Sequence, residues 1–280
     1  MECTEALQGE KVLIAIPSLS RPEEIGKKTL AFVANSGIPY KVFVEPQEAF
    51  LYKYYCGKEN VVKLAESGRG IGYSRNSMRK YAREHGYEYI FELDDDIQEF
   101  ARIDATDKTQ ALLHTIKDMV SAMKEYPKLA GVRFTQYRFW LYSKKDMHKW
   151  THINKPLQGV AFMRLSAIPE MSDYYTHFED TAISLLMWQN GYFTLNYGMS
   201  GLNVLQNQGK GGCNSGDRRQ SAKNSIEEIQ KVLPHVFETT GNSYFGVEMD
   251  IEYYLNKYHS APVNCNDDKL HIYLKQLGYE

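Results

Sequence analysis

Strand-like and helix-like patterns alternate along the first half of this 280-residue chain. Short apolar runs rich in β-branched and aromatic residues, such as KVLIAIP and YKVFVE, are each followed by a longer helical pattern. A parallel strand needs a long crossover to return to the same edge of a sheet, and that crossover is usually a helix. The alternation therefore predicts the α/β class, with a mostly parallel mixed sheet flanked by helices.

The same patterns give the expected elements and their grouping. Strands are expected at 11–17, 40–45, 60–65, 87–93, 129–135, 159–165 and 192–198. Helices are expected at 22–36, 71–85, 107–126, 178–190, 224–239 and 268–278. No repeat, low-complexity tract or long linker interrupts the chain. We therefore expect one α/β domain over 1–221, and a C-terminal helical extension over 222–280 that packs on the same domain.

Several classes of protein are excluded by composition. No apolar run approaches the roughly 20 residues of a membrane-spanning helix, and the N-terminus lacks the basic start and apolar centre of a signal peptide. Four scattered cysteines without a C-x-x-C pair indicate neither a zinc knuckle nor a disulfide framework. We expect a cytoplasmic protein without a membrane partner. Because the formal net charge is −2, a polyanionic partner would need a local basic patch.

Three consecutive aspartates, Asp94, Asp95 and Asp96, follow the predicted strand 87–93. In an open α/β sheet the ligand site lies off the carboxyl ends of the strands, which is where this triplet falls. Adjacent carboxylates raise one another's pKa, and a divalent cation offsets their repulsion. Hard oxygen ligands of this density suit Mg²⁺ or Mn²⁺. The alternative is a solvated acidic turn, which the apolar flanks on both sides disfavour.

Charged groups also lie at other predicted boundaries between elements. The first strand ends in Pro17-Ser18, and the next helix opens at Arg21. The segment THFEDTAIS places Glu179 and Asp180 at the head of a later helix. Acids in a first turn also stabilise the helix dipole, so this pair has a structural interpretation as well.

The motifs, in their order along the chain, resemble GT-A glycosyltransferases, nucleotide-sugar enzymes built on a Rossmann-like sheet. They are similar above all to the TET/JBP-associated glycosyltransferases, found mostly in bacteriophages, and to the related GREB-type domain. The shared pieces, which span about residues 11 to 220, are IPS with a following RP, VFVEP, RGI with RN, LDDDI, and a downstream ED. The resemblance implies transfer of a hexosyl or N-acetylhexosaminyl group from a UDP-sugar to the hydroxyl of 5-hydroxymethylcytosine or 5-hydroxymethyluracil in DNA. It also implies Mn²⁺ or Mg²⁺ as cofactor and, for a phage protein, the host cytoplasm as its location.

This resemblance assigns a donor site and a metal site. We expect Asp96 to bind the metal, with Asp94 either sharing it or lying nearer the ribose, and Asp95 in either role. His177 is a further candidate ligand because it adjoins the E-D pair, although a lone histidine commonly has a packing role. The other expected donor contacts are Pro17, Ser18, Arg21, Glu45, Arg69, Arg75 and Lys210.

The glycine turn and the glycine-rich stretch each have two interpretations. SGRGIGYSR resembles a dinucleotide fingerprint, but Arg75 stands where the third glycine is needed. We interpret it as a turn that presents Arg69 and Arg75 to the donor, with ordinary surface ion pairs as the alternative. The stretch 208–217 is either a loop that closes on the donor diphosphate through Lys210 or a surface loop with incidental charge.

Catalysis is assigned to the E-D pair. A positioned carboxylate that takes the acceptor's proton contributes roughly 10²- to 10⁴-fold in rate. Asp180 is the preferred base and Glu179 the second candidate, because neighbours at a helix start point in different directions.

Acceptor recognition is expected between the aspartates and this pair. Cationic and aromatic residues interleave over 133–152, as in sites that hold phosphates and unstacked bases. The expected DNA contacts are Arg138, Trp140, Tyr142, Lys144, Lys145 and Trp150. The alternative is a β-hairpin with a buried aromatic face and a wet cationic face.

Two other enzymatic functions use similar carboxylates: a GT-A enzyme with a protein or glycan acceptor, and a nucleotidyltransferase. The sequence leaves open the sugar, the base, the stereochemical course and the oligomeric state.

Overall fold

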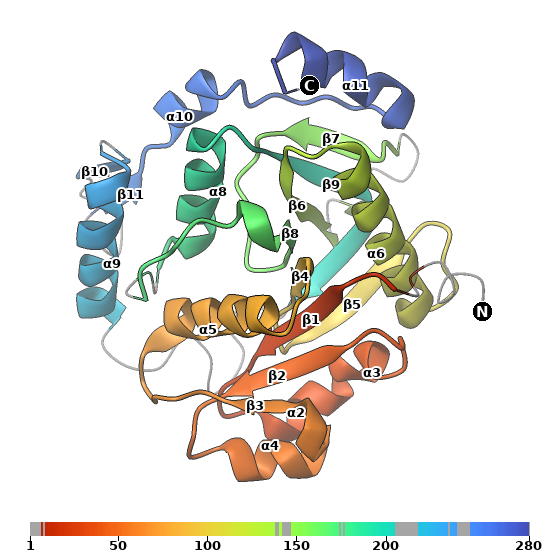
Figure 1. Ribbon diagram of the computed structural model, residues 1–280, viewed down its shortest axis with the longest axis vertical. Helices are drawn as coiled ribbons and strands as arrows, with labels where there is room; N and C mark the ends of the chain where they lie inside the picture. The colour runs from red at the N-terminus through yellow and green to blue at the C-terminus, as the bar shows by residue number, and fades with distance from the viewer. Residues whose placement is uncertain are drawn as a thin grey trace.

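A nine-stranded mixed sheet with helices on both faces forms the body of the protein, and this confirms the predicted α/β class (Figure 1). The computed structural model describes residues 7, 9–137, 140–141, 147–173, 175, 177–204, 218–234, 236–239 and 247–279. The strand order is β3-β2-β1-β4-β8-β6-β9-β5, and β7 pairs with β9 off this path. In chain order the strands are β1 (Val12–Pro17), β2 (Tyr40–Val44), β3 (Val61–Lys63), β4 (Tyr89–Glu92), β5 (Ile97–Arg102), β6 (Leu129–Gln136), β7 (Trp150–Ile153), β8 (Ala161–Arg164) and β9 (Phe193–Val204).

Parallel pairing dominates one half of the sheet and mixed pairing the other. Strands β3, β2, β1 and β4 run parallel to one another. Strand β8 then runs antiparallel to both β4 and β6. Strand β9 is parallel to β6 but antiparallel to β5 and β7. The carboxyl ends of β1, β2 and β4 therefore lie at the same edge.

Helices α5 (Gly70–Glu84) and α8 (Glu179–Gln189) cover one face of the sheet, and α6 (Lys108–Glu125) covers the other (Figure 1). Strand β1 shows the division. Leu13 and Ala15 belong to the apolar cluster that contains residues of α5 and α8, and Ile14 and Ile16 belong to the cluster that contains residues of α6. A strand buried on both faces is expected to be apolar throughout, as β1 is.

The prediction of one continuous helix at 22–36 is wrong. The segment is divided into α2 (Pro22–Lys27) and the short α3 (Leu30–Val33). Between them, Lys28 has φ −114° and ψ −102°, which lies outside the helical region. The fully buried Thr29 follows at the break, and its side chain turns toward the aspartates rather than along the helix.

Several elements were not predicted, among them α4 (Ala49–Cys56), β5 and β7. The buried residues of β5 are Ile97 and Phe100, and those of β7 are Trp150 and Ile153, so both are spaced by three. In each strand the pairing register shifts by a bulge after its first residue. A bulge inserts an extra residue, which hides the two-residue alternation by which strands are recognised.

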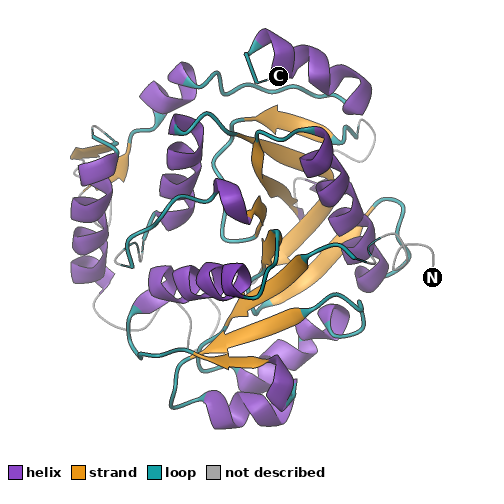
Figure 2. Ribbon diagram, in the orientation of Figure 1, coloured by secondary structure: helices purple, strands orange, loops and turns teal. Residues whose placement is uncertain are grey.

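The C-terminal segment contains α9 (Arg218–Val232), β10 (Phe237–Thr239), β11 (Val247–Met249), α10 (Glu252–Lys257) and α11 (Asp267–Gln276). The helix expected to reach 239 ends at 232, two residues before Pro234, which cannot continue it. The loop between α10 and α11 runs along β7 (Figure 2), with β-bridges at Ile153–Ala261 and Trp150–Cys265. The division into 1–221 and 222–280 stays a prediction, although α9 crosses that boundary.

Two sequence-based exclusions have structural counterparts in the described residues. None of their helices combines the length and apolarity that crossing a membrane would need. Cys56 and Cys265 are buried free thiols, and burial raises the pKa of each to about 11.

Candidate active site

Predicted donor residues from three separate segments meet at the carboxyl ends of β1, β2 and β4. Pro17 pairs with Phe43 across β1 and β2, so Ser18 and Glu45 follow neighbouring strand ends. Strand β4 ends one strand away and leads directly into the three aspartates. The structure therefore brings these residues together as the sequence predicted.

Asp95 and Asp96 are bound by Arg21. Its Nη1 lies 3.1 Å from Asp95 Oδ1 and 3.0 Å from Asp96 Oδ2. Ser18 donates a 2.5 Å hydrogen bond to Asp95 Oδ2, and its hydroxyl also lies 2.6 Å from the Tyr52 hydroxyl. Tyr52, which the sequence analysis missed, comes from the unpredicted helix α4.

Thr29 fixes the backbone of the aspartate turn. Its hydroxyl donates to the Asp94 carbonyl at 2.6 Å and accepts from the Ile97 backbone N–H at 3.1 Å. The break between α2 and α3 therefore has a function in this site. Thr29 and Asp94 are 65 residues apart, and no local pattern around Thr29 announced the contact.

Burial and mutual repulsion act on the three aspartates. Burial is the main cause of a raised pKa at each of them, and the neighbouring carboxylates add to it. Arg21 opposes the rise at Asp95 and Asp96, and Arg75 opposes it at Asp94. The turn therefore has more negative charge than its own cations compensate.

Arg75 joins the aspartate turn to the E-D pair. Its Nη1 lies 2.7 Å from Glu179 Oε1, its Nη2 lies 3.5 Å from Asp94 Oδ1, and its Nε lies 3.8 Å from Glu92 Oε2. The residue is only 5% exposed. The prediction that Arg75 contacts the donor is therefore corrected, because carboxylates of the protein enclose its guanidinium. Glu92 also accepts two hydrogen bonds from Arg79, at 2.7 and 3.1 Å.

Gly159 lies against this ion-pair cluster. A β-carbon at this position would come within 2.8 Å of Arg75 Nη2 and 3.4 Å of Asp94 Oδ2. Glycine therefore lets the loop before β8 pass directly over the guanidinium. The sequence analysis did not select this residue.

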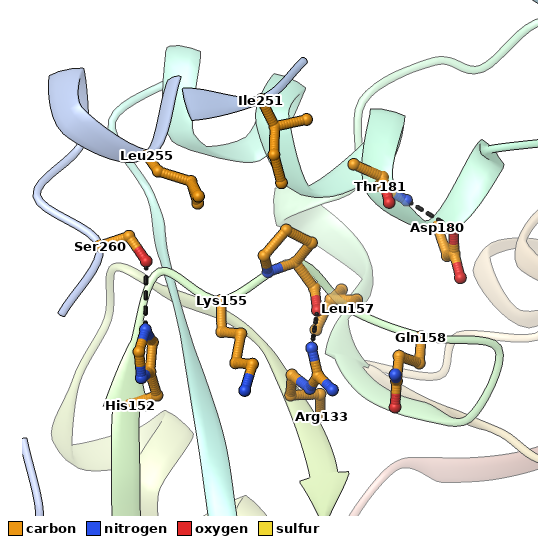
Figure 3. A pocket seen from close by; sticks show the side chains of 11 residues that line it. Arg133, His152, Lys155, Leu157, Gln158, Asp180, Thr181, Ile251, Leu255 and Ser260 are labelled. Carbon is orange, nitrogen blue, oxygen red and sulfur yellow. Dashed lines mark hydrogen bonds between the residues drawn. The ribbon is translucent and has the colours of Figure 1, made fainter. Parts of the chain in front are cut away.

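The two residues of the E-D pair point in different directions at the start of α8. Glu179 contacts Arg75, whereas Asp180 lines a cavity together with Thr181 (Figure 3). Burial raises the pKa of both carboxyls, that of Glu179 to about 7, against the opposing effect of Arg75. Phe178, directly before the pair, has φ +60°, a left-handed conformation that is costly for an aromatic residue and recurs at functional sites.

The cavity beside Asp180 has a volume of about 410 Å³. Figure 3 shows Arg133, His152 and Lys155 on one side and Ile251 and Leu255 opposite them. Arg133 and His152 are the first and last residues of the 133–152 stretch expected to recognise the acceptor, although neither was selected as an individual site residue. Lys155, Ile251 and Leu255 lie outside that stretch, and no motif marks them.

Glu45 and Arg69 form the rim of the glycine turn. Glu45 Oε1 accepts a 2.7 Å hydrogen bond from the Gly68 backbone N–H. Arg69 pairs with Glu66 at 2.7 Å, and its guanidinium lies 5.3 Å from the centre of the Tyr73 ring. Their contact with a donor, like that of Pro17, Ser18 and Arg21, stays a prediction.

The predicted set of three metal ligands is not assembled. Across the described residues, no three His, Cys, Asp or Glu side chains form a group that could hold a metal ion, so His177 does not join Asp94 and Asp96 in one. The backbone N–H of His177 donates instead to the Ser225 hydroxyl at 3.1 Å. Any metal here would depend on the aspartates and on oxygen atoms from its ligand.

Two of the expected DNA contacts are core residues, and this corrects their assignment. Trp150 is 0% exposed, donates from its indole nitrogen to Asp267 Oδ1 at 2.8 Å, and packs edge-on against Tyr197. Trp140 is 2% exposed and lies against the backbone of Gly201. Arg138, Tyr142, Lys144, Lys145 and Lys210 lie outside the described residues.

The solved structures of known proteins include distant similarities. One is glucosyl-3-phosphoglycerate synthase from Mycobacterium tuberculosis in complex with Mn²⁺ and UDP-glucose, at 9% identity, 89% of each chain and a TM-score of 0.49. The same enzyme with Mn²⁺, UDP-glucose and phosphoglyceric acid matches at 10% identity, over 89% of each chain and with a TM-score of 0.49. A197 from STIV matches at 13% identity, over 70% of this chain and 85% of that one, with a TM-score of 0.39.

By sequence alone, the chain matches one family model and no curated protein. A family model described as TET-Associated Glycosyltransferase matches residues 12–212. The matched region includes the strand ends, the three aspartates and the E-D pair, and it ends before α9.

Proposed function

The chain belongs to the TET-associated glycosyltransferase family, and from this premise we propose that it transfers a sugar from a UDP-sugar to the hydroxyl of a 5-hydroxymethylpyrimidine in phage DNA. The observation that carries the proposal is the Arg75 bridge, which holds the aspartate turn and the E-D pair in one cluster. Family membership supports the choice of acceptor. We place the reaction in the host cytoplasm, where a nucleotide sugar and phage DNA are both present.

The aspartate turn is the proposed site of the donor diphosphate and of Mn²⁺ or Mg²⁺. Its carboxylates are the hard oxygen ligands that these ions prefer, and such ions are commonly held by one or two carboxylates plus substrate phosphates. Asp94, about one third exposed, and Asp96 would hold the ion. When bound, the ion would stabilise the negative charge that grows on the departing diphosphate.

Arg21 and Arg75 act as positioning residues in this proposal. Arg21 holds Asp95 and Asp96 at fixed distances, while Arg75 holds Asp94 and Glu179. Both guanidiniums also offset the repulsion between carboxylates before the donor binds. The catalytic groups therefore need little rearrangement on donor binding.

Asp180 is the proposed base. It faces the cavity, whereas Glu179 is occupied by Arg75. Asp180 takes the proton of the acceptor hydroxyl as that oxygen bonds to the anomeric carbon of the sugar. The bond from that carbon to the diphosphate oxygen breaks, and the diphosphate leaves with the electron pair. A single displacement of this kind inverts the anomeric configuration.

Mass spectrometry of digested nucleosides tests the reaction. DNA with 5-hydroxymethylcytosine or 5-hydroxymethyluracil is incubated with the protein, Mn²⁺ and a panel of nucleotide sugars. We expect one modified nucleoside to gain the mass of a hexose or an N-acetylhexosamine. Asp180→Asn protein and DNA with unmodified pyrimidines serve as controls.

Other outcomes of this experiment separate the alternatives. Slow donor hydrolysis without any modified nucleoside would retain the glycosyltransferase and reject DNA as its acceptor. Release of pyrophosphate from a nucleoside triphosphate, with no use of nucleotide sugars, would indicate nucleotidyl transfer instead.

A further inference from the structure

The cavity beside Asp180 has the size and lining of a ligand site. Its volume of about 410 Å³ falls in the range of small-molecule pockets, roughly 300–1,000 Å³. Ile251 and Leu255 give it an apolar side, and Arg133, His152 and Lys155 give it a basic side (Figure 3). Asp180 is the sole carboxylate that the described residues contribute to the lining.

The basic side of the cavity includes cations that have no ion-pair partner in the described part of the chain. Among the described residues, no carboxylate oxygen lies within the 4.0 Å ion-pair distance of Arg133 or Lys155. Arg133 Nη1 donates to the Pro156 carbonyl at 2.8 Å, while its Nε is buried without a hydrogen-bond partner. Buried charges in proteins are almost always paired, and this half-buried guanidinium has no ion pair with a described residue, so it can bind an anionic ligand.

The ionisation of the lining agrees with a shortage of negative charge. Burial lowers the pKa of Arg133 to about 10, and Asp180 only partly offsets this effect. Burial and the nearby Arg133 lower the pKa of Lys155, which also lines the cavity. Burial, together with Lys155 and Arg133, lowers the pKa of His152 to about 4, so its ring is neutral at pH 7. An anion would relieve all three effects.

We propose that this cavity binds a phosphate group of the acceptor, paired with Arg133 and Lys155, and so places the acceptor hydroxyl at Asp180. The inference rests on the proposed function and deepens it, because it names the feature by which the acceptor is held. Arginine and lysine together suit a phosphate, because it accepts hydrogen bonds from a planar guanidinium and forms an ion pair with an ammonium. The three aspartates are absent from the lining, which separates this phosphate from the donor diphosphate.

The segment after 222 also gains a role. Ile251, which precedes α10, and Leu255 within it supply the apolar side, and the Ser260 hydroxyl lies 3.2 Å from His152 Nε2. These residues are held in place by the bridges between 261–265 and β7. The C-terminal segment therefore completes the acceptor site and does more than cover the sheet.

Phosphate binding can be measured without donor, metal or DNA. Histidine ring signals are followed by NMR during a titration with inorganic phosphate, and His152→Gln identifies the signal of His152. We expect a saturable shift of that signal in the wild-type protein. Lys155→Met should weaken binding at least about tenfold, as the loss of one charge-assisted contact implies.

A matched surface variant and a variant of the central cation complete the experiment. Lys80→Met removes an exposed lysine on α5, distant in sequence from the cavity, and should leave phosphate binding unchanged. Arg133→Gln should abolish it. Equal affinities in wild type and Lys155→Met, or no saturable shift in the wild type, would overturn the proposal.

Competition identifies the source of the phosphate. A single-stranded oligonucleotide that displaces inorganic phosphate indicates an internal phosphodiester, and a nucleoside 5′-monophosphate that does so indicates a terminal phosphate. If neither competes, the cavity does not hold an acceptor phosphate. Saturable phosphate binding without any modified nucleoside would reject DNA glycosylation and leave the anion site standing, so the two proposals fail separately.

Discussion

The aspartate turn and the basic cavity are neighbouring regions with opposite electrostatics. In the turn, Asp94, Asp95 and Asp96 each lie within 3.5 Å of an arginine nitrogen, so the protein itself supplies counter-charges. In the cavity, Arg133 and Lys155 have no such partner among the described residues. The contrast teaches that ion pairs within the protein already hold the turn in shape, although they leave it with excess negative charge. In our proposal, the cavity obtains its counter-charge only from a ligand.

The largest expected effect comes from breaking the internal pairing of the turn. Arg75→Met leaves Glu92, Asp94 and Glu179 without their shared cation. Removal of one partner of a buried pair costs about 3–5 kcal/mol, so the free energy of unfolding should fall by that amount and sugar transfer should be lost. Urea denaturation and turnover assays measure the two effects.

A half-buried arginine at the surface gives the control for this variant. Arg69 pairs with the exposed Glu66, and Arg69→Met should change the free energy of unfolding by less than about 1 kcal/mol. Similar losses in the two variants would show that the Arg75 cluster is not a buried network.

The second prediction separates the two residues of the E-D pair. Asp180→Asn should lower kcat by roughly 10²- to 10⁴-fold, because the acceptor hydroxyl loses its base. The loss should be in kcat rather than in the KM for donor, since Asp180 faces the cavity and the donor is assigned to the turn. A variant that keeps wild-type kcat would reject Asp180 as the base.

The third prediction concerns the pH dependence of stability. The pKa of Glu179 is raised to about 7 from its usual 4.5, so between these values the folded protein binds more protons than the unfolded chain. Its contribution to the free energy of unfolding is full below pH 4.5 and is lost as pH rises through 7, by at most about 3 kcal/mol. Urea denaturation from pH 5 to pH 8 should show this decline.

Glu179→Gln provides the control, because the amide does not titrate. The difference between wild type and this variant should change with pH across that window. A constant difference would mean that Glu179 stays ionised in the folded protein beside Arg75.

The fourth prediction tests the opposite ligand preferences directly. Mn²⁺ with UDP should raise Tm in the wild type, and EDTA should reverse the rise. At a ligand concentration of 100 times Kd, the free energy of unfolding should increase by about 2.7 kcal/mol. Asp96→Asn should lose this response and keep the response to phosphate. Lys155→Met should do the reverse. A variant that loses both responses would show that the two regions act as one site.

The smallest effect is expected where the loop crosses the turn. In Gly159→Ala the new β-carbon lies 2.8 Å from Arg75 Nη2, so the guanidinium must shift from Asp94. Overpacking of this kind costs about 1 kcal/mol and should reduce turnover by a few fold. Tm and kcat measure both effects, and an unchanged protein would show that the cluster tolerates movement.

The turn was largely predictable from sequence, and the cavity was not. Asp94, Asp95, Asp96 and the E-D pair belong to compact motifs at the boundaries of strands and helices, and such motifs can be recognised in the sequence. Arg133 belongs to the 133–152 stretch assigned to acceptor recognition, but Lys155 and Ile251 are isolated residues of common types, and only the fold brings them to it. Sequence also fails to tell a buried aromatic from an exposed one, which is why Trp150 was assigned to DNA.

Errors in the fold have similar physical origins. The bulges in β5 and β7 hid the alternation of buried residues. The break at Thr29 depends on a hydrogen bond to a residue 65 positions away. The end of α9, by contrast, carried a readable signal in Pro234.

The wall formed by α10 has a consequence for how this enzyme could diversify. The family match ends at residue 212, whereas Ile251, Leu255 and Ser260 lie beyond it. The apolar side of the proposed acceptor cavity is thus encoded apart from its basic side and from the donor residues, all of which lie within the matched stretch. We expect exchange of the segment after 212 alone to alter the apolar side of the cavity, and with it the choice of acceptor, while the residues assigned to the donor, the phosphate and the proton transfer stay unchanged.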